Sequence, residues 1–142
     1  MTVPVSLVRG YGLIVGAGLL LEGGALLALD VLHIAPGDTR HNALHVVWGL
    51  AILTLLAALR GARSTLLVVG GFGVFYTALA IMGVVIDQPF GLRLGPGENA
   101  FHFTVGPLAL LLSVVGFGQL SSSSNRSAES VSSAAPGSTS GA

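Results

Sequence analysis

Four long apolar stretches, separated by short polar connections, form the pattern of hydrophobic and polar positions along the chain. An α-helix rises about 1.5 Å per residue, so about 20 apolar residues cross the roughly 30 Å hydrocarbon layer of a bilayer. The pattern therefore predicts four transmembrane helices in an all-α integral membrane protein, folded as a four-helix bundle. The expected spans cover about residues 11–32, 42–59, 65–86 and 99–120.

Polar residues and prolines mark the ends of these stretches. A Pro-Gly-Asp turn precedes the second stretch, and Asp38 or Thr39 can cap the helix that follows it. Pro89 ends the third helix, because proline cannot continue one. Residues 121–142 are mostly serine, alanine and glycine, and such a segment buries too little apolar surface to offset its ordering entropy. We expect one four-helix domain over residues 1–120 and a disordered serine-rich tail after it.

The second and fourth stretches begin with the same motif, Asn-Ala-x-His-x-x-x-Gly, at an offset of 57 positions. The same offset relates Gly16 to Gly73 and Asp30 to Asp87. We interpret this as an internal duplication that produced two tandem helical hairpins. Each hairpin has an even number of helices, so both should share one orientation, related by a pseudo-twofold axis along the membrane normal. The motif residues are Asn42, His45 and Gly49 in one copy and Asn99, His102 and Gly106 in the other.

The motif spacing places its asparagine, histidine and glycine on one face of a helix. Polar side chains that face lipid are costly, so these faces should point into the bundle, where glycine lets helices pack closely. Asp30 and Asp87 end the preceding helices, and antiparallel pairing should bring them to the level of the histidines. The sequence thus predicts a symmetric polar cluster of Asp30, Asn42, His45, Gly49, Asp87, Asn99, His102 and Gly106.

Several roles suit this cluster. The leading hypothesis is a structural clasp in an accessory protein that needs no cofactor, because buried polar groups often join membrane helices. Alternatively, His45 and His102 could ligate a haem iron axially, or the aspartates and histidines could bind a divalent metal such as zinc. A proton relay or a site for a substrate headgroup is a further alternative. His33 and His41 are interpreted as loop residues outside the cluster. Either could join a metal site, but this alternative is not favoured.

Glu22 is an acid inside the first apolar stretch, and its counterpart in the second hairpin is Leu79. A charged acid at the centre of a bilayer costs about 2.5–3.5 kcal/mol. The favoured interpretation is a neutral acid that is hydrogen-bonded to Thr77, Tyr76 or the free carbonyl of Phe103. The alternative is the proton-coupling acid of a small-molecule transporter.

Composition supports the membrane class and argues against others. The chain is 52% hydrophobic and 8% charged, whereas about a quarter of the residues in a soluble domain are charged. Six arginines balance six acids and there is no lysine, so no basic patch predicts nucleic-acid binding. The absence of cysteine excludes disulfides, thiolate metal sites and thiol catalysis. No set of residues has a spacing typical of catalysis, so an enzyme is not favoured.

The motif segments, residues 40–49 and 98–106, resemble the small bacterial four-helix membrane family called domain of unknown function 4383. Its members are similar in size and carry Asn-x-x-His-x-x-x-Gly in the second and fourth helices. The resemblance covers about residues 9–120 and implies a bacterial membrane protein without an assigned activity. Glu22 and the compact first loop depart from the family, and no catalytic residue follows from the resemblance.

Arginine placement predicts how the chain is oriented. Four arginines fall on the side of the termini, and two fall on the other side among most of the acids. The positive-inside rule then places both termini in the cytoplasm, with the helices in the cell inner membrane. The lipid bilayer is the expected partner, and a second copy or another membrane protein is left open. The arginines on the side of the termini are Arg9, Arg60, Arg63 and Arg126.

Overall fold

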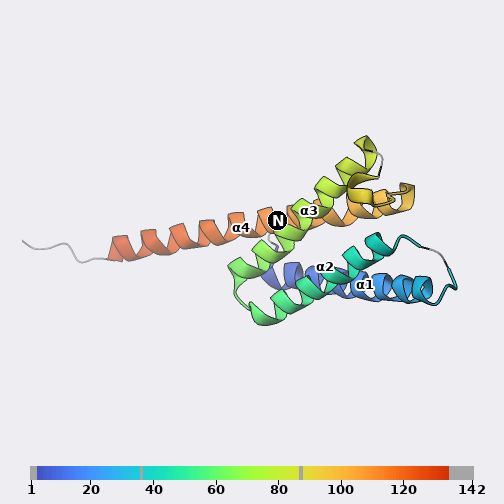
Figure 1. Cartoon of the computed structure of the whole chain (residues 1–142). Helices are drawn as coiled ribbons and strands as arrows, with labels where there is room; N and C mark the ends of the chain where they lie inside the picture. Colours follow the sequence, from blue (N-terminus) through green and yellow to red (C-terminus); the bar gives the residue numbers. More distant parts are fainter. Residues whose placement is uncertain (1–2, 36, 87, 135–142) are drawn as a thin grey trace, which may run out of the picture.

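The computed structural model describes residues 3–35, 37–86 and 88–134. This part of the chain folds into four long helices and one short 3₁₀ turn (Figure 1). All four helices are long and apolar enough to cross a membrane. The prediction of an all-α membrane protein is therefore confirmed. The elements are α1 (Val5–Val31), α2 (Thr39–Ala58), α3 (Ala62–Val85), η1 (Pro89–Gly91) and α4 (Pro96–Ala134).

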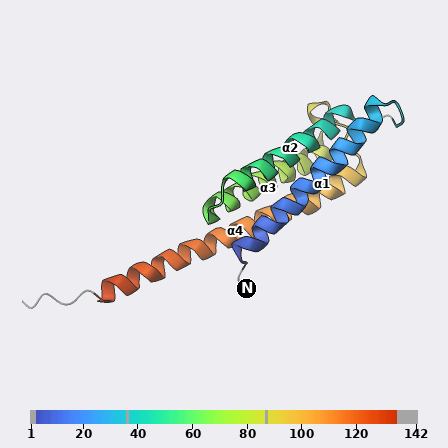
Figure 2. The same cartoon turned by 90° about the horizontal axis from the view of Figure 1, so that it is seen from below.

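The helices pack as two hairpins, α1 with α2 and α3 with α4, and contacts between the hairpins are sparser (Figures 1 and 2). The connection between α1 and α2 and the one between α3 and α4 lie at the same end, which we call the loop end of the bundle (Figures 1 and 2). The N-terminus and the turn between α2 and α3 lie at the opposite end, the termini end. There the guanidinium of Arg9 donates to the carbonyls of Leu56 and Leu59 at the end of α2.

Glycines at equivalent positions bring the helices of each hairpin together. A Cβ atom at Gly49 would lie 2.7 Å from the backbone oxygen of Gly16 and from the backbone nitrogen of Leu20. A Cβ atom at Gly106 would lie 2.6 Å from the backbone nitrogen of Thr77. Because Leu20 and Thr77 are themselves 57 positions apart, both hairpins make the same close contact at their motif glycine.

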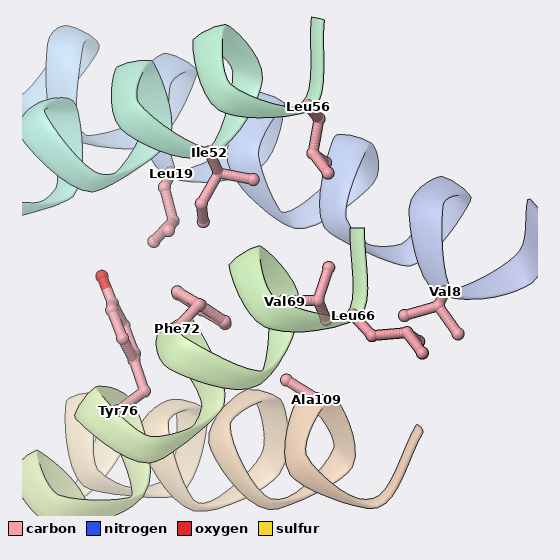
Figure 3. Close-up of a cluster of buried hydrophobic side chains, with 9 residues drawn as sticks. All are labelled: Val8, Leu19, Ile52, Leu56, Leu66, Val69, Phe72, Tyr76 and Ala109. Atoms are coloured by element: carbon pink, nitrogen blue, oxygen red, sulfur yellow. The ribbon is translucent and has the colours of Figure 1, made fainter. Parts of the chain in front are cut away.

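An apolar core joins the two hairpins from the middle of the bundle to the termini end (Figure 3). All four helices contribute to it, and its side chains are almost completely buried. Large apolar side chains on the outside, such as Ile14 and Val85, are mostly exposed, which suits a surface that faces lipid. The core consists of Val8, Leu19, Ile52, Leu56, Leu66, Val69, Phe72, Tyr76 and Ala109.

Helix α2 begins three residues earlier than the sequence pattern predicted. Asp38 is its N-cap, and the Asp38 carboxylate accepts hydrogen bonds from the backbone N–H groups of Arg40 and His41 at 3.1 and 3.2 Å. This cap satisfies donors that a helix start leaves free. As a result His41, which was interpreted as a loop residue, lies in the first turn of α2.

Helix α4 continues well past residue 120, so the predicted disordered tail is corrected for residues 121–134, which are helical. The hydroxyls of four successive serines, residues 121–124, each donate to the carbonyl four positions earlier. These bonds give the serine hydroxyls partners within the helix itself. Residues 135–142 of the predicted tail lie outside the described residues.

Candidate metal centre

Three histidines meet between the hairpins near the loop end. His41 and His45 lie one turn apart on α2, and His102 lies on α4. The ring centroids are 4.5 Å apart for His41 and His45, 5.5 Å for His41 and His102, and 6.1 Å for His45 and His102. One ring nitrogen of each residue lies within 4.8 Å of the other two. We call these three residues the histidine centre.

The imidazoles of the histidine centre are buried, and five of their six ring nitrogens lack hydrogen bonds among the described residues. His41 and His45 are each 5% exposed, and His102 is 0% exposed. Nε2 of His41 and both ring nitrogens of His45 and His102 have no hydrogen-bond partner among the described residues. A buried polar atom left without a partner costs about 1–3 kcal/mol, and native structures contain few of them. A metal ion bound by one nitrogen of each ring would supply a partner for three of these five nitrogens.

Asp38 holds the loop end together beside the histidine centre. Its carboxylate caps α2 and also accepts a hydrogen bond of 2.6 Å from the backbone N–H of Arg93, which lies just before α4. Partial burial raises the pKa of Asp38. The hydrogen bonds from the backbone N–H groups of Arg93, His41 and Arg40 lower it by more in total, so the pKa lies below its usual range. Asp38 therefore links the two hairpins where the histidines meet.

Two carboxylates flank the histidine centre. Oε2 of Glu22 lies 3.9 Å from Nδ1 of His45, and the Glu22 side chain is 54% exposed. Glu98 lies four residues before His102, and hence on the same face of α4. In the repeat alignment Glu98 is the counterpart of His41, at the offset of 57. The α2 face thus carries two histidines, and the equivalent α4 face carries a glutamate and a histidine.

The position of Glu22 differs from the favoured interpretation of the sequence. The hydroxyls of Tyr76 and Thr77, which were two of its expected partners, have no hydrogen-bond partner among the described residues. Instead Glu22 meets His45, because Gly23 lets α1 approach α2 closely at that level. A Cβ atom at Gly23 would lie 2.7 Å from the Cβ of His45 and from the backbone oxygen of Asn42.

Asp30 does not join the histidines, so the expected Asp–His pairing is corrected here. Its carboxylate accepts hydrogen bonds from the Thr39 hydroxyl and, at 3.3 Å, from the backbone N–H of Gly37. Asp30 stands in the last turn of α1, and its two donors lie in the following loop and at the first residue of α2. Asp87, its expected counterpart, lies outside the described residues.

The motif asparagines support the helix ends. Nδ2 of Asn99 donates to the carbonyl of Gly83 at 3.1 Å and to that of Leu94 at 3.5 Å, so it ties α3 to the start of α4. Asn42 is buried in the first turn of α2, and a Cβ atom at Gly37 would lie 3.1 Å from its Nδ2. Asn99 thus positions the start of α4 against α3, and Asn42 packs close to Gly37 in the loop before α2.

Aromatic rings surround the histidine centre on two sides. The ring centroid of Tyr76 lies 5.0 Å from that of His102 and 6.3 Å from that of His45. The Phe101 centroid lies 5.8 Å from that of His102 and 6.0 Å from that of His45. Sequence reasoning missed His41 and Tyr76 as neighbours of the motif histidines. The spacing of His41 and His45, four positions on one helix, was the available signal for the first.

This arrangement has the chemistry of a metal site. Imidazole is a ligand for zinc, copper, iron and nickel, and three protein ligands with a free position are typical of zinc sites that exchange a ligand. No family model matches the chain, and comparison with curated proteins and with solved structures gives no match either. The functional argument therefore starts from the geometry of the histidine centre.

Proposed function

We propose that this small multi-pass membrane protein binds a divalent transition-metal ion at His41, His45 and His102. The observation that carries the proposal is the convergence of three buried imidazoles, with one nitrogen of each within 4.8 Å of the others. A structural clasp would need these rings to be hydrogen-bonded, yet five of their six nitrogens have no such partner among the described residues. Metal coordination accounts for the convergence and gives three of these five nitrogens a partner.

A single ion suits the geometry better than haem does. Axial ligation of haem by His45 and His102 would require a flat space for the porphyrin between their rings. The ring of His41 lies against both of them, with centroids at 4.5 and 5.5 Å. Three converging imidazoles instead favour an ion such as Zn²⁺, Co²⁺ or Cu²⁺. The nearby carboxylate of Glu22 can offset part of the cost of a buried positive charge.

The membrane and the orientation form part of the same proposal. We place the helices in a bacterial inner membrane with both termini in the cytoplasm, because arginines concentrate at the termini end. The loop end and the histidine centre would then face outward. The equivalent close contacts at Gly49 and Gly106 support an origin by internal duplication. Membership of the family called domain of unknown function 4383 rests on the repeated motif alone.

Cobalt substitution tests the metal site directly. Purified protein in detergent should bind one equivalent of Co²⁺ and develop the visible d–d bands of a site with nitrogen ligands. Replacement of His41, His45 or His102 by alanine should abolish or strongly weaken these bands. His33→Asn is the matched control, because His33 is exposed in the turn after α1 and asparagine tolerates its φ of 56°.

The possible outcomes separate the alternatives. Bands that are lost in the three centre variants and kept in His33→Asn support the proposal. Wild-type protein that binds no Co²⁺, or a His102→Ala variant that binds it as wild type does, overturns it. A Soret band in protein purified from cells would instead support the haem alternative.

A further inference from the structure

A cavity of about 190 Å³ leads to the histidine centre between the two hairpins. It opens where α1 and the first turns of α4 face each other, with His45 of α2 among its lining residues. Two of the five lining residues are acidic, and none is an arginine. The lining consists of Glu22, His45, Gly97, Glu98 and Phe101.

His45 shows that this cavity serves the histidine centre. Its side chain is more than nine-tenths buried, yet it lines the cavity, and both of its ring nitrogens lack hydrogen bonds among the described residues. Oε2 of Glu22 lies 3.9 Å from Nδ1 of the same ring. A cation entering the cavity would thus pass from exposed carboxylates to a buried imidazole.

The opposite side of the histidine centre is closed by apolar side chains. Tyr76 packs against His102 and His45 and belongs to the apolar core that continues towards the termini end (Figure 3). Leu19, Ile52 and Phe72 of that core are 2% exposed or less. An ion moving in this direction would lose its ligands and its water together, which costs many kcal/mol in an apolar interior.

We propose that the histidine centre exchanges its divalent metal ion only through the acidic mouth formed by Glu22 and Glu98, so that the protein binds the ion from the loop end and does not conduct it. This inference rests on the proposed metal-binding function. Glu22 and Glu98 attract the cation and pass it to His45, and the apolar core prevents passage to the termini end. The transporter alternative, with Glu22 as a coupling acid, is replaced by a role for Glu22 in ion capture.

Association kinetics test the acidic mouth. Stopped-flow mixing of Co²⁺ with Glu22→Gln and Glu98→Gln, followed through the d–d bands, should give association rates at least about threefold below wild type at low ionic strength, because charge steering raises on-rates. The difference should shrink as salt screens the carboxylates. The band shape should stay that of wild type, since the imidazoles remain. Glu129→Gln, which removes an acid from the distal part of α4, is the matched control.

A flux measurement tests the closed side. Proteoliposomes that contain a zinc-sensitive dye are mixed with external Zn²⁺, and an ionophore added at the end gives the full signal. We expect the dye to respond no faster than in protein-free liposomes. The inference is overturned if the dye responds faster in wild-type proteoliposomes than in protein-free liposomes, while His102→Ala proteoliposomes show no such increase. That result would show that Zn²⁺ is conducted through the histidine centre.

The two proposals can fail separately. If wild-type protein binds no Co²⁺, the metal-binding function itself fails. If it binds Co²⁺ but both glutamine variants associate at the wild-type rate, the acidic mouth is wrong and the metal centre stands. Thermal unfolding of each variant without metal shows whether a slower association reflects a lost charge or an altered fold, and unchanged unfolding with a slower rate supports the mouth.

Discussion

His41 and His102 belong to different hairpins and lie 61 positions apart in the chain, yet their ring centroids are 5.5 Å apart. Contacts between the hairpins are otherwise sparser than contacts within them. An ion held by both residues would therefore add a connection between two hairpins that pack against each other sparsely. Metal binding and bundle stability should be linked for this reason.

We predict that Zn²⁺ or Co²⁺ raises the midpoint temperature of unfolding of the wild-type protein in detergent. A ligand that binds only the folded state stabilises it by about 2.7 kcal/mol at a concentration of a hundred times its Kd. His41→Ala and His102→Ala should lose most of this shift, and His33→Asn should keep it. An equal shift in wild type and His102→Ala would place the bound ion elsewhere.

A second prediction concerns the motif glycines. Gly49→Ala and Gly106→Ala should each lower the free energy of unfolding by about 1–3 kcal/mol, because the added methyl group would meet backbone atoms of the partner helix at 2.6–2.7 Å. Gly18→Ala and Gly71→Ala are matched controls on α1 and α3, since a Cβ atom there meets nothing within 4 Å. Unfolding in a denaturing detergent series measures the difference. A Gly106→Ala protein as stable as Gly71→Ala would contradict the close contact.

The helices were predictable because lipid imposes a simple requirement on composition and length. The predicted ends of the helices were less accurate, because local hydrogen bonds decide where a helix begins. Asp38 was recognised as a possible cap, but the helix was expected to begin at residue 42, so His41 was assigned to a loop. Counting the first turn from the Asp38 cap would have placed His41 and His45 on one face.

The side-chain partners at the loop end were harder to predict. Antiparallel pairing predicted Asp30 at the level of the histidines, but its carboxylate accepts hydrogen bonds from Gly37 and Thr39 instead. The rotation of one hairpin against the other is not encoded in a hydrophobic pattern, because the helices are apolar on most sides. Contacts that depend on this rotation, such as His41 with His102 and His45 with Tyr76, therefore needed the structure.

A third prediction concerns the Asp38 cap, tested without added metal. Asp38→Ala should lower the free energy of unfolding by about 1 kcal/mol or more, because a lost N-cap costs about this much and the link to the Arg93 N–H is lost as well. Hydrogen bonds hold the pKa of Asp38 below its ordinary value of 3.8. The stability that its charge provides is therefore complete above that value and is lost as the pH falls through it towards the lower folded pKa.

The measurement is the unfolding midpoint of wild type and Asp38→Ala between pH 7 and pH 3. The gap between the two proteins should be constant down to about pH 4.5 and should narrow below it. A gap that does not change with pH down to pH 3 would mean that the Asp38 charge does not contribute to the cap.

The last prediction concerns orientation, and the cysteine-free sequence makes it simple to test. Ala35→Cys introduces a thiol in the exposed connection between α1 and α2 at the loop end, and Gly61→Cys introduces one in the exposed turn at the termini end. A membrane-impermeant maleimide should label Ala35→Cys in intact bacterial spheroplasts and should label Gly61→Cys only after the membrane is permeabilised. Wild-type protein gives the background. The reverse pattern would place the termini outside, and the acidic mouth of Glu22 and Glu98 would then draw its metal ion from the cytoplasm.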